Sequence, residues 1–332
     1  MLENINIIDY KYFKDFQIDG LNRINIISGK NNVGKTALLE ALLLIENSKS
    51  VRNLIQVIQF IFINRDLSLF DIDKYLETIN LSFKFENVNI TLKHKFIDEL
   101  NDIENSKIDR YRNSSEEFLI LYINNEPQII PFYKSSDSFT RMRKNKIELS
   151  FINSSRPDNA NLAKLYSYIQ DLEIQDDFLK ELKIIDDNII RIEPQVRENG
   201  NFNLRITLNN PKQSFYSSEL GEGTNRYIEI LATLLSNSGG SVFIDEIENG
   251  IHYSKLKDIW KSIIEIVRDK KIQLFVTTHD KETIEAFSEA CEEMDFKDIC
   301  SIELFKKDNI IHPILRDYDS FNATVSSGMD IR

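Results

Sequence analysis

The sequence is poor in the residues that build disulfide-rich or membrane-spanning proteins. It has two cysteines among 332 residues, Cys291 and Cys300, and no CxxC pair. That excludes a disulfide scaffold and a cysteine-rich zinc site, and it favours a reducing compartment. Apolar runs such as residues 41–45 fall far short of the ~20 residues that cross a bilayer. The N-terminus carries acids and lacks the pattern of a signal peptide. We therefore expect a cytoplasmic protein with no membrane partner.

Positive charge is scarce as well. The chain has 41 Lys and Arg against 53 Asp and Glu, a formal net charge of −12. A general electrostatic coat for DNA is therefore disfavoured, although a local basic groove would still admit DNA as a partner. The hydrophobic fraction of 42% and the charged fraction of 28% are typical of globular proteins. At roughly 150 residues per domain, the length indicates two domains or one domain with an insertion.

Glycine is rare, with 10 in the chain, and this makes one glycine-containing stretch informative. Residues 29–36 read GKNNVGKT and match the pattern G-x-x-x-x-G-K-[ST] in full. They follow an apolar stretch typical of a strand (residues 23–28) and precede a helical pattern (residues 35–45). In such a loop, backbone N–H groups and the N-terminus of the helix bind phosphate. The predicted nucleotide-binding residues are Gly29, Lys30, Asn31, Asn32, Val33, Gly34, Lys35, Thr36 and Ala37.

Two further residue pairs extend this prediction to catalysis. We expect Lys35 to reach the β- and γ-phosphates and the Thr36 hydroxyl to hold Mg²⁺. An apolar strand at residues 241–245 ends in Asp245 and Glu246, at the edge where open α/β sheets bind ligands. This pattern predicts Asp245 as a metal ligand and Glu246 as the general base that activates water. The alternative interpretation is a solvated strand end.

A histidine and a glycine-rich turn complete the set of candidates. His279 follows a second apolar strand at residues 272–277, where it could contact the γ-phosphate and distinguish triphosphate from diphosphate. Gly221, Glu222 and Gly223 precede a helical run at residues 227–236 and predict a second anion-binding surface. Because the phosphate loop already encloses its own ligand, this surface would meet ATP held by a second copy across a two-fold interface. A structural histidine and a simple helix cap are the alternatives.

The remaining chain shows a less regular middle between two α/β blocks. Strands alternating with helices at both ends predict a mostly parallel sheet. Residues 158–183 carry one long helical pattern, and residues 189–208 a hairpin around Asn199-Gly200. Asp317-Tyr318-Asp319 is interpreted as a solvated turn.

The order of these motifs resembles the ABC-type ATPase heads shared by SMC proteins and the OLD (overcoming-lysogenization-defect) family. Such heads carry a Walker A loop, a signature, a Walker B strand, a D-loop and a switch histidine in this order. They match residues 29–36, 220–226, 242–246, 248–252 and His279. The chain is similar in particular to the stand-alone AAA family ATPases of anti-phage systems such as PARIS, Septu and Gabija. The signature lacks the Ser-Gly-Gly-Gln of transporter cassettes, which argues against a transporter.

This resemblance implies an α/β fold: an ABC-type P-loop NTPase head with a mixed β-sheet and an inserted α+β lateral subdomain. Residues 1–50 and 151–332 would form the ATPase core, and residues 51–150 the insertion. It also implies an ATPase that uses ATP and Mg²⁺, forms at least a homodimer, and controls a separate effector such as a TOPRIM-type nuclease, since too few residues follow His279 to build that domain.

Two alternative functions stay open. One is an SMC-like DNA-repair or DNA-scanning ATPase, which the missing heptads disfavour. The other is a non-hydrolysing ATP sensor, which Glu246 and His279 disfavour.

Overall fold

The computed structural model describes residues 1–48, 50–64, 81–85, 88–108, 115, 117–132, 150–196, 202–209, 212–329 and 331. Three β-sheets organise this part of the chain. Within these residues no helix is both long enough and apolar enough to span a bilayer.

The central sheet is mixed, as expected, and carries both α/β blocks. Its strand order is β15-β14-β3-β13-β12-β8, and all neighbours are parallel except the β14–β15 hairpin. The strands are β3 (Ile24–Gly29), β8 (Phe151–Ile152), β12 (Ser241–Ile244), β13 (Gln273–Thr277), β14 (Ile299–Lys307) and β15 (Ile310–Arg316). The parallel strands β3, β12 and β13 are buried along their whole length because helices cover both faces of the sheet.

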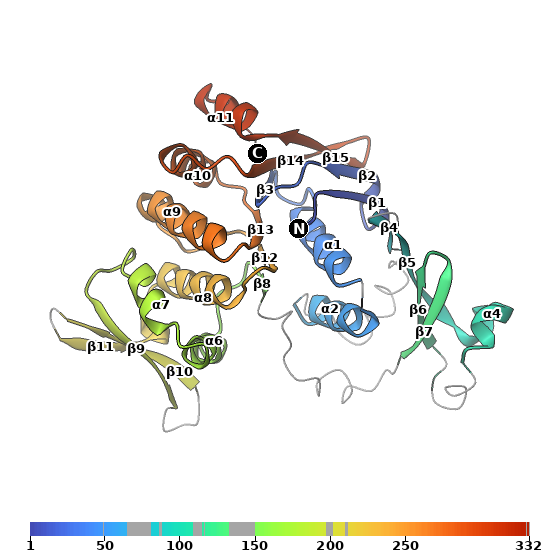
Figure 1. Ribbon diagram of the computed structural model, residues 1–332, viewed down its shortest axis with the longest axis horizontal. Coiled ribbons are helices and arrows are strands. Elements are labelled where there is room, and N and C mark those ends of the chain that lie inside the picture. Colours follow the sequence, from blue (N-terminus) through green and yellow to red (C-terminus); the bar gives the residue numbers. More distant parts are fainter. Residues whose placement is uncertain are drawn as a thin grey trace.

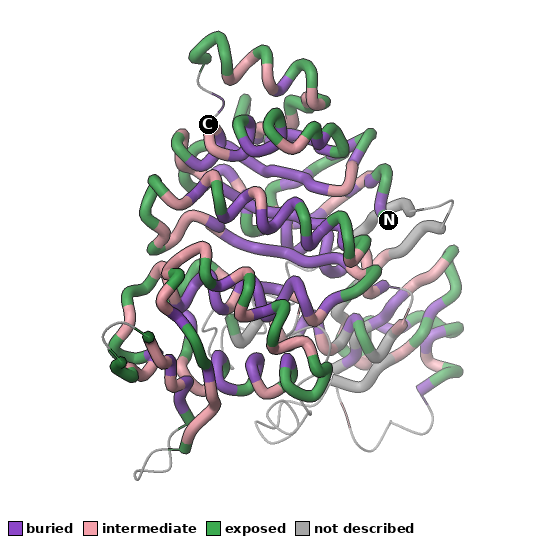
Figure 2. The backbone as a smooth tube through the Cα atoms, turned by 60° about the vertical axis from the view of Figure 1, so that its left-hand side comes forward, coloured by how far each residue is buried: buried purple, intermediate pink, exposed green. Residues whose placement is uncertain are grey.

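Two apolar cores hold these helices against the sheet. Alternate residues of β3 serve opposite faces: Ile24 and Ile26 belong to one core and Ile27 to the other. Figure 1 shows α1 and α2 on one side of the sheet and α8, α9 and α10 on the other. Figure 2 shows the central strands as long buried segments. These helices, with α11, are α1 (Lys35–Asn47), α2 (Val51–Asn64), α8 (Glu222–Ser236), α9 (Tyr253–Asp269), α10 (Lys281–Glu293) and α11 (Tyr318–Ser326).

The second sheet joins the N-terminal hairpin to strands of the middle region. It is antiparallel, and its strand order is β2-β1-β4-β5-β6-β7. The strands of the predicted insertion, β4 to β7, therefore extend a sheet that the N-terminal hairpin β1–β2 starts. Phe13 at the start of β2 and Ile311 of β15 share one core, which sets this hairpin beside the central sheet. The elements are β1 (Asn4–Tyr10), β2 (Phe13–Asp19), β4 (Leu81–Phe85), β5 (Val88–Phe96), β6 (Glu117–Ile123), β7 (Glu126–Phe132) and the short helix α4 (Asp102–Asn105).

The third sheet packs with two helices in which the structure corrects the sequence prediction. It is formed by β9 (Ile189–Val196), β10 (Phe202–Leu208) and β11 (Gln213–Tyr216). The predicted β9–β10 hairpin is present, and its turn at Asn199-Gly200 lies outside the described residues. The single helix predicted over residues 158–183 is wrong, because the chain forms α6 (Asn159–Asp171) and α7 (Gln175–Leu182).

The break between α6 and α7 is a Schellman motif. Glu173 adopts a left-handed backbone with φ of 58°. Ile174 N–H donates to Ile169 O at 3.2 Å, and Glu173 N–H donates to Gln170 O at 3.0 Å. These bonds satisfy the last carbonyls of α6 and end the helix without a glycine.

The Asp317-Tyr318-Asp319 segment is a second correction. It is a helix start rather than a solvated turn, because the Asp317 carboxylate accepts a hydrogen bond from Ser320 N–H at 3.0 Å and caps α11.

Candidate functional site

The loop between β3 and α1 has a backbone that two glycines permit. Gly29 has φ of 142°, and a Cβ there would lie 2.6 Å from the backbone oxygen of Leu304. Gly34 has φ of 106°, and its Cβ would lie 2.9 Å from Ile311 Cδ1. The torsion angle therefore disfavours a side chain at both positions, and at Gly29 the neighbouring backbone also leaves no space for one. The loop is wound tightly where α1 begins.

Lys35 is curled into this loop. Its side chain is buried, and Nζ donates hydrogen bonds to Gly29 O at 2.7 Å and to Lys30 O at 3.1 Å. Burial lowers the pKa of Lys35, while the carboxylates of Glu246, Asp245 and Glu248 oppose this effect. The ammonium group is thus held at the base of the loop, next to acidic groups, and an entering anion would compete with the two carbonyls for its N–H groups.

Asp245 lies at the end of β12 and faces the start of α1. Its Oδ2 accepts a hydrogen bond from Thr36 Oγ1 at 2.9 Å, and its Oδ1 accepts one from Thr277 Oγ1 at 2.6 Å. Burial raises the pKa of Asp245, and both hydroxyl contacts work against that rise. The two side chains present only oxygen donors, which are the ligands that Mg²⁺ prefers. Thr36 and Asp245 therefore fit a magnesium ion, and they are the residues that would hold it.

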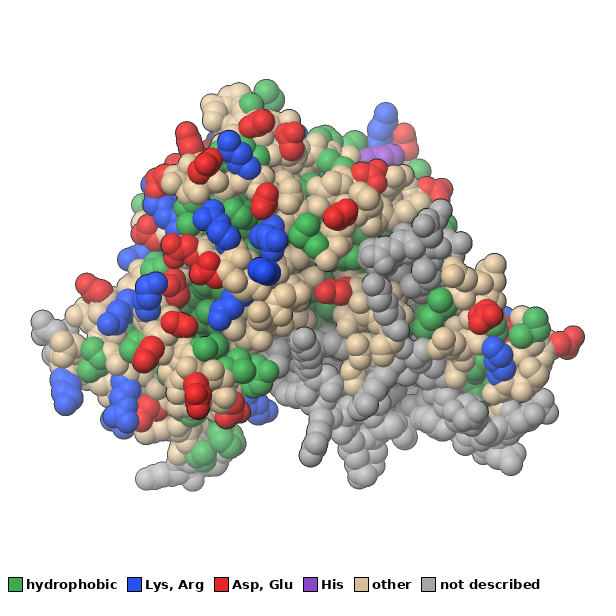
Figure 3. All heavy atoms as spheres, in the orientation of Figure 1, with side chains coloured by type: hydrophobic (Ala, Val, Ile, Leu, Met, Phe, Trp, Pro, Cys, Tyr) green, Lys and Arg blue, Asp and Glu red, His purple; other side chains and the backbone are tan. Residues whose placement is uncertain are grey.

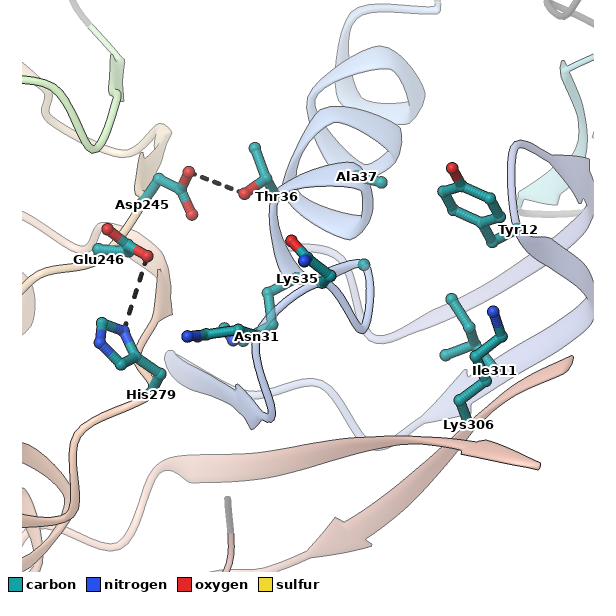
Figure 4. Close-up of a pocket in the computed structure, with 12 residues that line it drawn as sticks. Tyr12, Asn31, Lys35, Thr36, Ala37, Asp245, Glu246, His279, Lys306 and Ile311 are labelled. Atoms are coloured by element: carbon teal, nitrogen blue, oxygen red, sulfur yellow. Dashed lines mark hydrogen bonds and ion pairs between the residues drawn. The ribbon is translucent and has the colours of Figure 1, made fainter. Parts of the chain in front are cut away.

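Glu246 is held in an unusual backbone conformation. Its φ is 49°, a left-handed angle that costs a non-glycine residue on the order of 1–3 kcal/mol and is common at functional sites. The Thr277 hydroxyl stabilises this turn by accepting Glu246 N–H at 2.8 Å. The side chain accepts a hydrogen bond from Asn249 Nδ2 at 2.8 Å. As a result the carboxylate of Glu246 lines the cavity next to Thr36 and His279 (Figure 4).

His279 follows β13 and borders the same cavity. Its Nδ1 lies 3.6 Å from Glu246 Oε1 and 3.1 Å from Glu248 Oε1. The side chain is 39% exposed, so part of the ring is open to the cavity. Figure 4 shows the ring beside Glu246, on the side of the cavity formed by the ends of β12 and β13.

The cavity has a volume of about 640 Å³ and extends beyond the predicted residues. Across from Glu246 lie Tyr12, Lys306 and Ile311 (Figure 4). Tyr12 is 63% exposed, and Lys306 Nζ lies 5.9 Å from the centre of its ring. Sequence reasoning did not assign these residues a role. The lining residues are Tyr12, Asn31, Asn32, Gly34, Lys35, Thr36, Ala37, Asp245, Glu246, His279, Lys306 and Ile311.

Three residues of the predicted loop do not line the cavity. Gly29 and Lys30 contribute backbone carbonyls to Lys35 instead. The side chain of Val33 is 6% exposed and packs into the core beneath the loop. The structure thus brings together most of the predicted loop with Asp245, Glu246 and His279.

The glycine-rich turn at residues 221–223 lies outside this cavity. The helix begins earlier than predicted, since Gly221 is the N-cap of α8 and Glu222 its first residue. Gly221 and Glu222 are exposed. A Cβ at Gly221 would meet no atom of the described residues within 4 Å, whereas one at Gly223 would lie 2.3 Å from Gly250 O. Packing within the chain therefore explains why residue 223 is a glycine. It does not explain why residue 221 is one.

Arg226 connects the same helix to the end of β12. It is buried, and its guanidinium donates to the backbone oxygens of Asn153 at 2.6 Å, Asp245 at 2.6 Å and Glu246 at 3.2 Å. Its Nη1 also contacts Glu229 Oε2 at 3.2 Å. The sequence offered no signal for this role beyond the arginine's position in the predicted signature. Arg226 fixes the backbone that carries Asp245 and Glu246.

Comparisons with known proteins identify the family. The family described as "AAA domain, putative AbiEii toxin, Type IV TA system" matches residues 24–285. The chain is 27% identical over 350 aligned positions to an ATP/GTP phosphatase of Helicobacter pylori, with 93% of each protein covered. It is 34% identical over 103 residues to an uncharacterized protein of Methanocaldococcus jannaschii, which covers 28% of this chain and 47% of that protein.

Solved structures show the same fold at low sequence identity. An SMC head bound to the C-terminal winged-helix domain of ScpA superposes with a TM-score of 0.51 at 10% identity, covering 96% of this chain and 98% of that one. An SMC head with an extended coiled coil, bound to the C-terminal domain of ScpA derived from Pyrococcus furiosus, gives a TM-score of 0.50 at 8% identity, with 98% of each chain covered. The family match spans more than half of the chain, so the protein belongs to this AAA-domain ATPase family, and its fold is like that of an SMC head.

Proposed function

We propose that this protein is a Mg²⁺-dependent, ATP-hydrolysing switch that closes with a second copy around nucleotide and thereby controls a separate effector in bacterial anti-phage defence. One observation carries the proposal. Lys35, Thr36, Asp245, Glu246 and His279 gather around a single cavity, while the exposed end of α8 is left outside it. The cavity volume of about 640 Å³ suits a nucleotide-sized ligand.

The residues around the cavity divide the work of hydrolysis. The loop amides and Lys35 would bind the phosphates, and Thr36 and Asp245 would hold Mg²⁺, which offsets phosphate charge when bound. Glu246 would take a proton from the water that attacks the γ-phosphorus as the bond to the β-phosphate oxygen breaks. General-base assistance of this kind typically contributes 10²–10⁴-fold.

The exposed ring of Tyr12 offers a surface on which the base can stack, worth roughly 1–3 kcal/mol. Stacking does not distinguish the two purines. The relative named as an ATP/GTP phosphatase makes GTP the expected second substrate.

The N-terminus of α8 supports association with a second copy. This helix has 15 residues, and its first N–H groups lie at Gly221 and Glu222, which are exposed. Such a terminus attracts anions, and the terminal phosphate of a second copy is the anion that a two-fold arrangement would supply. Next to it, Tyr253 follows the turn at Gly250 and is 68% exposed, an aromatic side chain available for contact.

A trapped-substrate experiment tests this function. Glu246→Gln keeps the size of the side chain and removes the base, so it should bind ATP, hydrolyse it at least about 100-fold more slowly and accumulate as an ATP-bound dimer. Lys35→Ala should lose nucleotide binding and remain monomeric. Glu265→Gln, on the exposed face of α9, is the matched control. Light scattering with and without ATP reports the mass. Ordinary turnover in the Glu246 variant, or no ATP-dependent change in mass, contradicts the proposal.

The effector and the defence role are supported by resemblance to anti-phage ATPases, and they imply a cytoplasmic protein with a partner such as a TOPRIM-type nuclease. The ATP-locked Glu246→Gln and the nucleotide-free Lys35→Ala variants form a matched pair for capturing that partner from the native host. We expect capture to differ between the two variants, and phage protection of the native operon to be lost with Lys35→Ala. Equal phage protection by the wild-type operon and by the operon carrying Lys35→Ala would contradict the role in defence.

A DNA-scanning ATPase is the second candidate, and the fold shared with SMC heads favours it. Charge argues against it. On the face seen in Figure 3, basic and acidic side chains of the described residues are interspersed without a continuous basic patch. Stimulation of ATP hydrolysis by double-stranded DNA, declining steeply with salt, would support this alternative.

A further inference from the structure

Glu248 is an acidic residue near the cavity to which the mechanism above gives no task. It belongs to the turn between β12 and α9 and does not line the cavity. Its side chain is 10% exposed. Burial raises the pKa of Glu248, and the backbone N–H of His279 is the largest effect that opposes the rise. A carboxyl group buried at this cost needs a partner, and its ion-pair partner is His279.

The two groups meet through two contacts. Oε1 of Glu248 accepts a hydrogen bond from His279 N–H at 3.0 Å and lies 3.1 Å from His279 Nδ1. The second contact is close but not aligned as a hydrogen bond. Two atoms of these residues, Nδ1 of His279 and Oε2 of Glu248, are buried and have no hydrogen-bond partner among the described residues. A small rotation of the imidazole would let Nδ1–H donate to this carboxylate, which gives the buried Nδ1 a partner.

Glu246 is not equivalent to Glu248 in this respect. Its Oε1 is farther from Nδ1, at 3.6 Å, and its other oxygen accepts from Asn249. Glu246 is also 32% exposed and lines the cavity, where water can reach it. The carboxylate of Glu246 thus lines the cavity, and the carboxylate of Glu248 lies outside it, next to Nδ1 of His279.

We propose that Glu248 is a positioning residue for His279: by accepting both the backbone N–H and Nδ1–H, it fixes the ring so that Nε2, which carries a proton of its own, donates to the terminal phosphate. The inference rests on the proposed function, in which His279 contacts that phosphate. Because a histidine's two nitrogens are distinct, the partner of one decides which is left for the ligand. Glu248 also begins the turn in which Gly250 packs against Gly223 of α8. The same residue thus connects His279 to the turn that contacts the start of α8.

The test separates positioning from a purely structural role. Glu248→Ala should lower kcat about 10- to 100-fold while KM changes less than about threefold, because substrate binding by the loop is intact. Glu248→Gln keeps an acceptor oxygen of the same reach and should recover most of that loss. Glu265→Gln serves as the exposed control. Equal loss in Ala and Gln variants, or no loss in the Ala variant, overturns the inference.

Nitrogen NMR of ¹⁵N-histidine-labelled protein gives a readout that does not depend on turnover. The chain has four histidines, and His279→Gln assigns the signal. With ATP bound, we expect Nδ1 to carry a proton in the wild type and in Glu248→Gln, and Nε2 alone to carry one in Glu248→Ala. A wild-type ring protonated on Nε2 alone overturns the inference even if the Ala variant fails to fold. Full activity of His279→Gln would instead overturn the proposed role of His279, so the two failures are distinguishable.

Discussion

Gly221 provides a test of the two-copy arrangement that leaves the monomer intact. Its φ of −59° and ψ of 152° suit any residue, and a Cβ there meets no atom of the described residues within 4 Å. Gly221 is the N-cap of α8, where Asp is a better cap than Gly by a few tenths of a kcal/mol. The helix dipole adds about 0.3–1 kcal/mol for the negative charge. Gly221→Asp should therefore leave the unfolding free energy unchanged or raise it slightly.

The same aspartate should oppose association around ATP. If Gly221 faces a partner's terminal phosphate at about 4 Å, the added charge is repelled by about 4 kcal/mol at an effective dielectric constant near 20. A two-fold dimer contains this contact twice, so ATP-driven dimerisation should weaken by at least about a thousandfold, the factor for one contact. Gly221→Ala, without charge, should weaken it far less. Nucleotide binding by the monomer should not change, because Gly221 is not part of the cavity lining.

The assay combines urea unfolding, nucleotide binding and light scattering in the Glu246→Gln background, where ATP persists. Gly223→Ala is the contrast: its Cβ would lie 2.3 Å from Gly250 O, so we expect a loss of stability of about 1–3 kcal/mol from overpacking. Wild-type dimerisation of the Gly221→Asp variant would refute the reasoning, because the helix end would then face no phosphate.

Three other outcomes test the surroundings of the site. Arg226→Met should lower the unfolding free energy by about 3–5 kcal/mol in urea titrations, because the backbone oxygens of Asn153, Asp245 and Glu246 lose their buried donor. Little change would remove Arg226 from its structural role. Burial raises the pKa of Glu229 from 4.5 to about 7, so the protonated form favours folding. The free energy of unfolding of the wild type, measured relative to that of Glu229→Gln, should therefore fall as pH rises from about 4.5 to about 7. A flat difference between the two unfolding curves would contradict that sign. Thr277→Val, which removes the hydroxyl between Asp245 and Glu246, should raise the Mg²⁺ concentration needed for turnover, while Thr277→Ser should not; equal Mg²⁺ titrations would contradict this.

The sequence predicted the parts of the site that depend on local backbone chemistry. The glycines and Lys35 occur at fixed spacing because the loop must wind between a strand and a helix, and Asp245 and His279 follow apolar strands whose carboxyl ends meet. The mostly parallel central sheet followed from the alternation of these strands with helices, and the family resemblance implied that the sheet would be mixed. The roles of the site residues stay predictions.

Contacts between distant segments could not be read from the sequence. Arg226 reaches the backbone of Asn153, 73 positions away, and Tyr12 enters the cavity because β2 lies beside β15. The break at Glu173 was hidden because no glycine, proline or asparagine marks it, although Glu173 takes the left-handed angle. The pairing of β1 with β4 was likewise invisible, since β-strand patterns do not name their partners.

The position of β3 has a consequence for how the protein is made. This strand, which carries the loop, lies between β13 and β14, so its neighbours are synthesised about 240 residues later. At roughly 5–20 residues per second, a ribosome needs on the order of 12–50 seconds to deliver them. During that interval the apolar residues of β3 have no sheet to join. A nascent chain should therefore be unable to capture nucleotide, and we expect chaperones to engage it early.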